Sequence, residues 1–210
     1  MTTHPPSNSP TPLVPNSSHA PSPTVTVDAH AHLAEKKILP LTRDVRGRVI
    51  TVSDAAFEGA REDLSGPLAQ QILAKYRVVA DRDIVPDGVE PVRAAIRQAI
   101  NSGARVIVTS GGTGVTPRDL TPEATMPLLE VRLDAIAQQI VTYGLTKTPL
   151  ASLSRGLVGI TQRGPHGCLV VNAPGSRGGV RDALAVVGPL IAHILEQFDP
   201  EQFPLPSRQQ

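Results

Sequence analysis

The sequence has few of the residues that several large classes of protein require. Among its 210 residues there is no tryptophan, and there are only three phenylalanines, two tyrosines and one cysteine, Cys168. A single cysteine excludes an internal disulfide framework and a multi-cysteine metal cage. The formal net charge is only +1. With so little basic excess and so few aromatic side chains to stack on bases, we expect no nucleic-acid binding.

Long apolar runs and a leader-like N-terminus are also missing. No apolar run approaches the ~20 residues that a membrane-spanning helix needs. The N-terminus lacks the basic-then-apolar pattern of a secretory signal. We therefore expect a cytoplasmic protein with no membrane association. Hydrophobic residues make up 40% of the chain, enough for an aliphatic core. Cys168, in the segment "CLVVN", is expected to be an inert thiol in a buried strand.

Composition divides the chain into a tail and one domain. Residues 1–46 begin with "MTTHPPSNSPTPLVPNSSHAPSPT", which cannot bury enough apolar surface to fold and therefore predicts disorder. His30 and His32 could ligate a metal, but no third ligand is spaced nearby, so we interpret them as a solvated pair. Residues 47–198 predict the folded domain, and residues 199–210 a flexible C-terminus.

Strand-like and helix-like segments alternate along the domain. The expected strands are residues 48–53, 78–87, 105–109 and a late strand beginning at Cys168. The expected helices begin near Ser65 and Val92, run from Thr121 to about Tyr143, and run from Gly179 to Phe198 with a break at Gly188-Pro189. This order predicts βαβ units, and hence a parallel sheet covered by helices on both faces.

Polar residues follow the ends of three of these strands. In such sheets ligands bind outside the carboxyl ends of the strands, so Ser53-Asp54, Asp87 and the segment Gly111–Asp119 should meet at one edge. The loop "GGTG" leaves backbone N–H groups able to surround an anion such as phosphate. A tight turn that only lets a helix pack on the sheet explains the same glycines, and both interpretations remain open.

Asp119 sharpens the interpretation of the loop. A carboxylate beside a phosphate nest repels the anion unless a divalent cation lies between them, and Mg²⁺ is normally held by one or two carboxylates plus phosphates. Asp87 could supply the second carboxylate, and Arg118 could neutralise phosphate charge. Each aspartate alone could be a helix or turn cap. The loop lacks the Lys-Ser/Thr of a Walker A motif and is not GxGxxG. Together these features favour phosphoryl or nucleotidyl transfer.

Several of these motifs resemble the MogA/MoaB family of molybdenum cofactor biosynthesis. The segment "TSGGTGVTPRDLTPEAT" matches the family signature nearly position for position. The resemblance continues through "TVSDAAFEGAREDLSGP", "VPDG", "LSR" and "NAPGSRGGVRDAL", and covers roughly residues 47–197. It implies a three-layer α/β/α sandwich with a mostly parallel central sheet, usually assembled as a homotrimer.

The resemblance also implies an activity and a set of site residues. Active members are molybdopterin adenylyltransferases, which use Mg²⁺ and ATP to adenylylate the terminal phosphate of molybdopterin and release pyrophosphate. Their product passes to a molybdenum-insertion protein. Asp87 and Asp119 match the catalytic, metal-binding aspartates. The implied substrate-binding residues are Ser53, Asp54, Gly111, Gly112, Thr113, Gly114, Arg118, Ser154, Pro174, Gly175 and Ser176, with Ser154 holding molybdopterin.

Three positions depart from the family pattern. Gly88 and Leu133 stand where a glutamate is common, and "SRGGVR" places Arg177 and Arg181 where a short run ending in lysine is common. Two other readings stay open beside the enzyme. One is a non-catalytic MoaB-like protein that binds molybdopterin or a nucleotide as carrier or scaffold. The other is a molybdate-inserting domain, which usually sits in a longer, multidomain chain.

Overall fold

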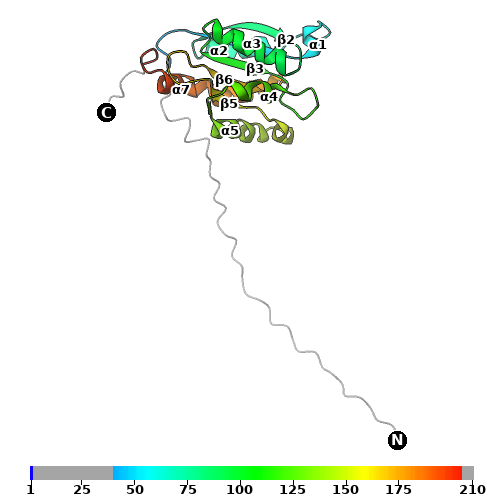
Figure 1. The fold of residues 1–210 in the computed structure, drawn as a ribbon. Coiled ribbons are helices and arrows are strands. Elements are labelled where there is room, and N and C mark those ends of the chain that lie inside the picture. The colour runs from blue at the N-terminus through cyan, green and yellow to red at the C-terminus, as the bar shows by residue number, and fades with distance from the viewer. Residues whose placement is uncertain (2–39, 205–210) are drawn as a thin grey trace. The chain divides into compact units, whose positions relative to one another are not determined.

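A computed structural model describes Met1 and residues 40–204 of the chain, and residues 40–204 form a sheet covered by helices on both faces (Figure 1). The strands are β1 (Val45–Val52), β2 (Val78–Val85), β3 (Val106–Ser110), β4 (Val131–Arg132), β5 (Val158–Ile160) and β6 (Leu169–Ala173). The helices are α1 (Asp54–Phe57), α2 (Ser65–Ala74), α3 (Val89–Asn101), α4 (Thr121–Thr125), α5 (Asp134–Leu145), α6 (Arg177–Val187) and α7 (Ile191–Phe198). Short 3₁₀ helices are η2 (Met126–Leu128), η3 (Pro149–Leu153) and η4 (Gly188–Leu190). His30 and His32 lie outside the described residues.

The order of strands in the sheet creates a crevice between β1 and β3. The order is β2-β1-β3-β6-β5-β4; β1 pairs in parallel with both β2 and β3, and β3 pairs in parallel with β6. From β1 the chain goes to β2 on one side and then crosses to β3 on the other. Loops that leave β1 and β3 therefore diverge, which is where open α/β sheets bind ligands. The predicted three-layer, mostly parallel fold is confirmed, with β5 and β4 added antiparallel.

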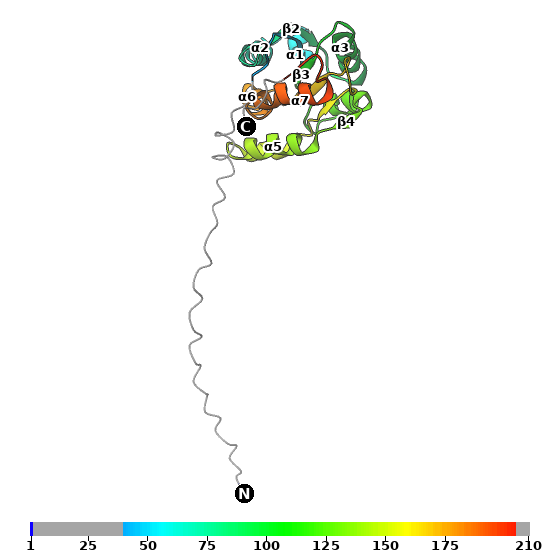
Figure 2. The same ribbon diagram turned by 90° about the vertical axis from the view of Figure 1, so that its left-hand side faces the viewer.

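The two faces of the sheet carry separate apolar clusters because neighbouring strand residues point to opposite sides. Val49, Val108 and Val171 pack with α2, α5, α6 and α7, whereas Ile50 and Ile107 pack with α3 and α4. Figure 2 shows α2 and α6 on one side of the sheet and α3 on the other. Cys168 belongs to the second cluster, and burial raises the pKa of its thiol. Continuous apolar strands buried on both faces are typical of parallel sheets.

The expected helix from Thr121 to about Tyr143 is wrong as a single element. The segment contains α4, η2, β4 and α5, and α4 ends at Thr125. Pro127 lacks the N–H needed to continue α4 and clashes with the preceding turn, so the chain tightens into η2 and leaves the helix. Strands β4 and β5 were not expected from the sequence. They contain two and three residues, too few to show a period of two.

The helices α6, η4 and α7 run continuously from Arg177 to Phe198, with the predicted break at Gly188-Pro189 appearing as η4. By length and composition this 22-residue stretch could cross a membrane. More than half of its most apolar window, 56%, is buried inside the fold. Leu184, Ile191 and Leu195 are among its residues in the larger apolar cluster. The stretch is therefore a core element of the domain.

The core extends beyond both predicted boundaries of the domain. Leu41 and Val45 are buried before residue 47, and Asp199 and Phe203 are buried after residue 198. Arg105 accounts for the second extension. Its Nη2 lies 2.8 Å from Oδ2 of Asp199, and its guanidinium carbon lies 5.1 Å from the centre of the Phe203 ring. An ion pair and a cation–π contact thus fasten the described end of the chain to the sheet.

Replacing Phe203 with alanine should lower the free energy of unfolding by about 3 kcal/mol, because a large buried aromatic side chain leaves a cavity when it is truncated. Urea denaturation followed by circular dichroism measures this loss. The neighbouring exposed residue provides the control, and Glu201→Ala should leave stability nearly unchanged. Equal midpoints for the two variants would show that Phe203 contributes nothing to the core.

Candidate functional site

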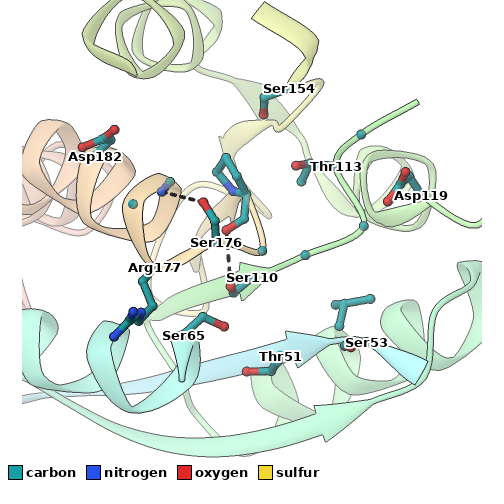
Figure 3. Close-up of a pocket in the computed structure, with 18 of the residues that line it drawn as sticks. Thr51, Ser53, Ser65, Ser110, Thr113, Asp119, Ser154, Ser176, Arg177 and Asp182 are labelled. Carbon is teal, nitrogen blue, oxygen red and sulfur yellow. Dashed lines mark hydrogen bonds between the residues drawn. The ribbon is translucent and has the colours of Figure 1, made fainter. Parts of the chain in front are cut away.

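A cavity of about 840 Å³ opens at the carboxyl ends of the parallel strands, beside the crevice between β1 and β3 (Figure 3). Most of the residues predicted for the site line it: Ser53, Asp87, Gly111, Gly112, Thr113, Gly114, Asp119, Ser154, Pro174, Gly175 and Ser176. They come from segments far apart in the sequence, as expected if strand ends meet at one edge. Asp54 and Arg118 do not line the cavity.

The backbone of the Gly111–Gly114 loop requires glycine at its first two positions. Gly111 and Gly112 have φ angles of 115° and 63°, in the left-handed region that side chains rarely adopt. A Cβ atom on Gly111 would collide with the carbonyl oxygen of Val52, and one on Gly112 with the hydroxyl of Thr121. The Gly111 amide donates to the carbonyl of Ala173 at 3.1 Å, so that amide is not available to a ligand. The loop is thus a tight packing turn that also lines the cavity.

Asp119 holds this loop in shape. Its Oδ2 accepts a hydrogen bond from the backbone amide of Thr116 at 2.8 Å. The pKa of Asp119 lies below its usual value, and the largest cause is a hydrogen bond from the Thr116 side chain. The amides of Thr116 and Gly114 lower this pKa further, whereas burial of the carboxylate opposes the shift. The interpretation of Asp119 as a turn cap is therefore correct for this state. The same bonds present an ionised carboxylate to the cavity at neutral pH.

Asp87 is held by a reciprocal pair of bonds with Asp54. Oδ2 of Asp87 accepts from the Asp54 amide at 3.1 Å, and Oδ1 of Asp54 accepts from the Asp87 amide at 2.9 Å. Arg118 lies 3.5 Å from Oδ2 of Asp54 with its side chain 75% exposed. Asp54 thus contacts both Asp87 and Arg118, and neither Asp54 nor Arg118 lines the cavity. The turn at Asp87 continues through Gly88, whose φ of 125° favours glycine.

Arg155 ties together the segment that carries Asp119, a role that sequence reasoning missed. Its Nε donates to the carbonyl of Gly114 at 2.8 Å and its Nη2 to the carbonyl of Asp119 at 2.6 Å. Its Nη1 pairs with Glu123, and this hydrogen bond lowers the pKa of Glu123 and raises that of Arg155. The Arg155 amide also donates to the carbonyl of Thr113. The sequence signal that could have pointed to Arg155 was its place in the motif "LSR", directly after the predicted site residue Ser154.

Comparison with known proteins decides the family. Residues 48–193 match the model of the family described as "Probable molybdopterin binding domain". The chain belongs to this family. A member from Pyrococcus furiosus named "Molybdopterin adenylyltransferase" is 38% identical over 154 residues, which are 70% of this chain and 88% of that protein. The resemblance to MogA/MoaB proteins is therefore confirmed.

A solved structure and a much longer protein are also similar to this chain. The solved structure titled "tungsten cofactor synthesizing protein MoaB" from Pyrococcus furiosus is 36% identical with a TM-score of 0.67, covering 74% of this chain and 97% of that one. "Molybdenum cofactor synthesis protein cinnamon" from Drosophila melanogaster is 36% identical over 150 residues, 69% of this chain. The chain spans only 24% of the length of that protein.

The cavity of this molybdopterin binding family member is rich in charge, and carboxylates outnumber cations. Its charged lining residues are Glu62, Asp63, Asp87, Asp119 and Asp182, against Arg61, Lys147 and Arg177. Of these eight, Asp87 and Asp119 were the site residues predicted from the sequence, whereas the predicted Asp54 and Arg118 are not in the lining. Asp63 caps the start of α2 by accepting from the amides of Ser65 and Gly66, and Arg61 donates to the hydroxyl of Ser53 at 3.0 Å.

The carboxylates of Asp87 and Asp119 are the kind of oxygen donor that a divalent cation such as Mg²⁺ prefers when a bound ligand supplies further oxygens. Among residues 40–204, no group of three or more His, Cys, Asp or Glu side chains could hold a metal ion. Asp87 and Asp119 are two carboxylates on one cavity. Mg²⁺ is commonly held by one or two carboxylates while water and substrate phosphates complete its shell. The residues present therefore suit Mg²⁺ that arrives with a phosphate ligand and do not form a complete protein cage.

Replacing Arg155 with methionine should loosen residues 113–123 while leaving the fold nearly intact. Half-exposed ion pairs contribute about 0–1 kcal/mol, so the free energy of unfolding should fall by no more than about 1 kcal/mol. Amide hydrogen exchange in peptides covering this segment should accelerate by up to about fivefold, the equivalent of about 1 kcal/mol, because three contacts on the segment are lost.

The matched control for this variant is Arg163→Met, which breaks the exposed pair of Arg163 with Glu130 away from the cavity. It should leave exchange at residues 113–123 unchanged. Unaltered exchange in Arg155→Met would refute the fastening role of Arg155.

Proposed function

We propose that this protein is a molybdopterin adenylyltransferase, which transfers the adenylyl group of ATP to the terminal phosphate of molybdopterin. The main support is that one cavity at the switch point of the sheet brings Asp87 and Asp119 together with the glycine loop. The relative from Pyrococcus furiosus with this name aligns over 70% of the chain. The motifs that carry these aspartates match the MogA/MoaB signature, including the context "RDLTPEAT".

The reaction needs two phosphate groups held in line more than it needs a reactive side chain. An oxygen of the molybdopterin phosphate attacks the α-phosphorus of ATP, the bond from that phosphorus to the bridging oxygen breaks, and pyrophosphate leaves. The attacking phosphate is already ionised near neutral pH, so no strong general base is required. Catalysis then consists of positioning and of offsetting the charge that develops at the α-phosphorus.

Charge in the cavity explains why a divalent cation belongs to this reaction. Carboxylates outnumber cations among the lining residues, so the bare cavity repels a triphosphate. Mg²⁺ held by Asp87, Asp119 and substrate phosphates would supply the positive charge that this lining lacks. Asp54 and Arg155 keep the two carboxylates in place through the backbone bonds described above. Ser154, at the edge of the same cavity, is assigned to molybdopterin.

The MogA/MoaB resemblance also supports a setting for this enzyme. We infer that it assembles as a homotrimer, acts in the cytoplasm and passes its adenylylated product to a molybdenum-insertion protein. Arg118, which is exposed beside Asp54 and does not line the cavity, is assigned to a substrate phosphate on the resemblance alone. Sedimentation of the purified chain measures the oligomeric state, and a monomer would contradict the trimer.

Asp119→Asn and Asp87→Asn should each lower turnover roughly a hundredfold or more, because each removes an anionic ligand of the Mg²⁺ that offsets charge in the transition state. Asparagine keeps an oxygen that can accept from the Thr116 or Asp54 amide, so the fold should survive. The assay mixes protein, molybdopterin, ATP and Mg²⁺ and quantifies adenylylated pterin. Asp134→Asn, which alters an exposed aspartate outside the cavity, is the control.

Two results would contradict this assignment. Wild-type turnover in Asp119→Asn would remove the catalytic role of that residue. A wild-type protein that binds molybdopterin or ATP and forms no adenylylated product would identify the non-catalytic carrier or scaffold instead.

Removal of divalent cations should stop product formation, because the carboxylates and phosphates in the cavity then repel one another. Turnover is measured in excess EDTA and again after Mg²⁺ is restored. Adding NaCl to the same ionic strength is the control, because general screening should not replace a bound cation. Undiminished turnover in EDTA would exclude the metal-binding role of Asp87 and Asp119.

A further inference from the structure

A second charged pair lies in the cavity, away from the aspartates discussed above. Lys147, which follows α5, donates a hydrogen bond from Nζ to Oδ1 of Asp182 on α6. Both residues line the cavity, and Figure 3 shows Asp182 and Asp119 on opposite sides of it with Ser176 between them. The proposed chemistry at Asp87 and Asp119 does not use this pair.

Because Asp182 is buried, its carboxylate needs a cation close to it. The Asp182 side chain is only 10% exposed, and a buried carboxylate is costly unless a cation compensates it. Lys147 is the cation that the structure provides. Gly144 lets α5 approach η3, because a Cβ there would lie 2.8 Å from the Cβ of Ala151, and the same Cβ would be in ordinary contact with Oδ2 of Asp182 at 4.0 Å. The bond to Asp182 on α6 therefore sets the position of the Lys147 ammonium group.

Lys147 is nevertheless accessible to a ligand. Its side chain is 46% exposed, and its Nζ lies 4.2 Å from the centre of the Tyr143 ring. The hydrogen bond with Asp182 raises the pKa of Lys147, so the group is a cation at neutral pH. An ammonium group has three N–H donors, so contacts with Asp182 and Tyr143 leave capacity to donate to an oxygen in the cavity.

We propose that Lys147, anchored by Asp182, binds a phosphate oxygen of one of the two substrates. This inference rests on the proposed function, in which the cavity holds the phosphates of both ATP and molybdopterin. The lining has only two other cations, Arg61 and Arg177, and Arg61 is engaged with Ser53. A cation paired with Asp182, across the cavity from Asp119, would offset phosphate charge at a point away from the Mg²⁺ that the two aspartates would hold. Asp182 acts as a positioning residue.

The test compares two lysine variants of the full chain. Lys147→Gln and Lys75→Gln change the net charge equally. Lys75 is exposed, directly follows α2 as its C-cap residue and does not line the cavity. Calorimetric titration with Mg-ATP and, separately, with molybdopterin measures the dissociation constants. Lys147→Gln should raise Kd for one ligand roughly tenfold, the effect of losing one charge-assisted hydrogen bond. Lys75→Gln should match the wild type, and Lys147→Arg should recover most of the loss.

The ligand that loses affinity identifies which phosphate Lys147 contacts. A double-mutant cycle then tests Asp182. If Asp182 acts through Lys147, Asp182→Asn weakens binding in the wild-type background but has no further effect in Lys147→Gln. A persistent effect in that background would refute the positioning role. Unchanged binding of both ligands by Lys147→Gln, or equal losses in Lys75→Gln, would overturn the proposal.

Failure of this inference is distinct from failure of the proposed function. If the wild type forms adenylylated pterin and Lys147→Gln binds both ligands normally, the enzyme assignment stands and the lysine inference is wrong. If Lys147 is needed for ligand binding and the wild type forms no product, the lysine site stands and the catalytic assignment is wrong.

Discussion

The close approach of three strand ends at Gly111 is the constraint on which the site depends. The end of β3 lies so near the carbonyl of Val52, at the end of β1, that no side chain fits between them. On the other side, a Cβ on Gly175 after β6 would lie 3.1 Å from the Cα of Gly111. Parallel pairing of β1, β3 and β6 thus continues into their loops. The loops are forced together at one edge, and the side chains that follow them converge on one cavity.

A buried polar network joins two of these strands, β3 and β6. The amide group of Asn172 on β6 donates to the hydroxyls of Thr109 on β3 and Thr125 on α4, both at 3.0 Å. Its Oδ1 accepts from the amide of Leu157. Buried polar groups are tolerated when their bonds are satisfied, and satisfied networks restrict the alternatives open to a core. This network fixes β6 against β3 and α4, one residue before Ser110 on β3, which lines the cavity.

The two central aspartates illustrate how structural and chemical uses of one group can coexist. Asp119 and Asp87 each accept a backbone hydrogen bond that shapes a loop, as turn caps do. A carboxylate has two oxygens with about four lone-pair sites, so the loop bonds leave acceptor capacity for a ligand. The loop bonds fix the orientation of the carboxylate before a ligand arrives, which reduces the reorganisation required at the reaction. The exposed pair of Arg155 and Glu123 contributes geometry in the same way and little stability.

The sequence alone determined the features that arise from local chemistry. Apolar strands, helix starts, the glycine turn and the aspartates at strand ends depend on neighbouring residues and on the rule that parallel strands end at one edge. Tertiary structure decided the pairings between distant residues. Arg155 and Glu123 are 32 residues apart and Lys147 and Asp182 are 35 apart, and no local pattern relates them. It also left Asp54 and Arg118 out of the lining of the cavity, extended the core to Phe203 and added the short strands β4 and β5. Contacts of this kind follow from how the layers pack, which residue spacing does not encode.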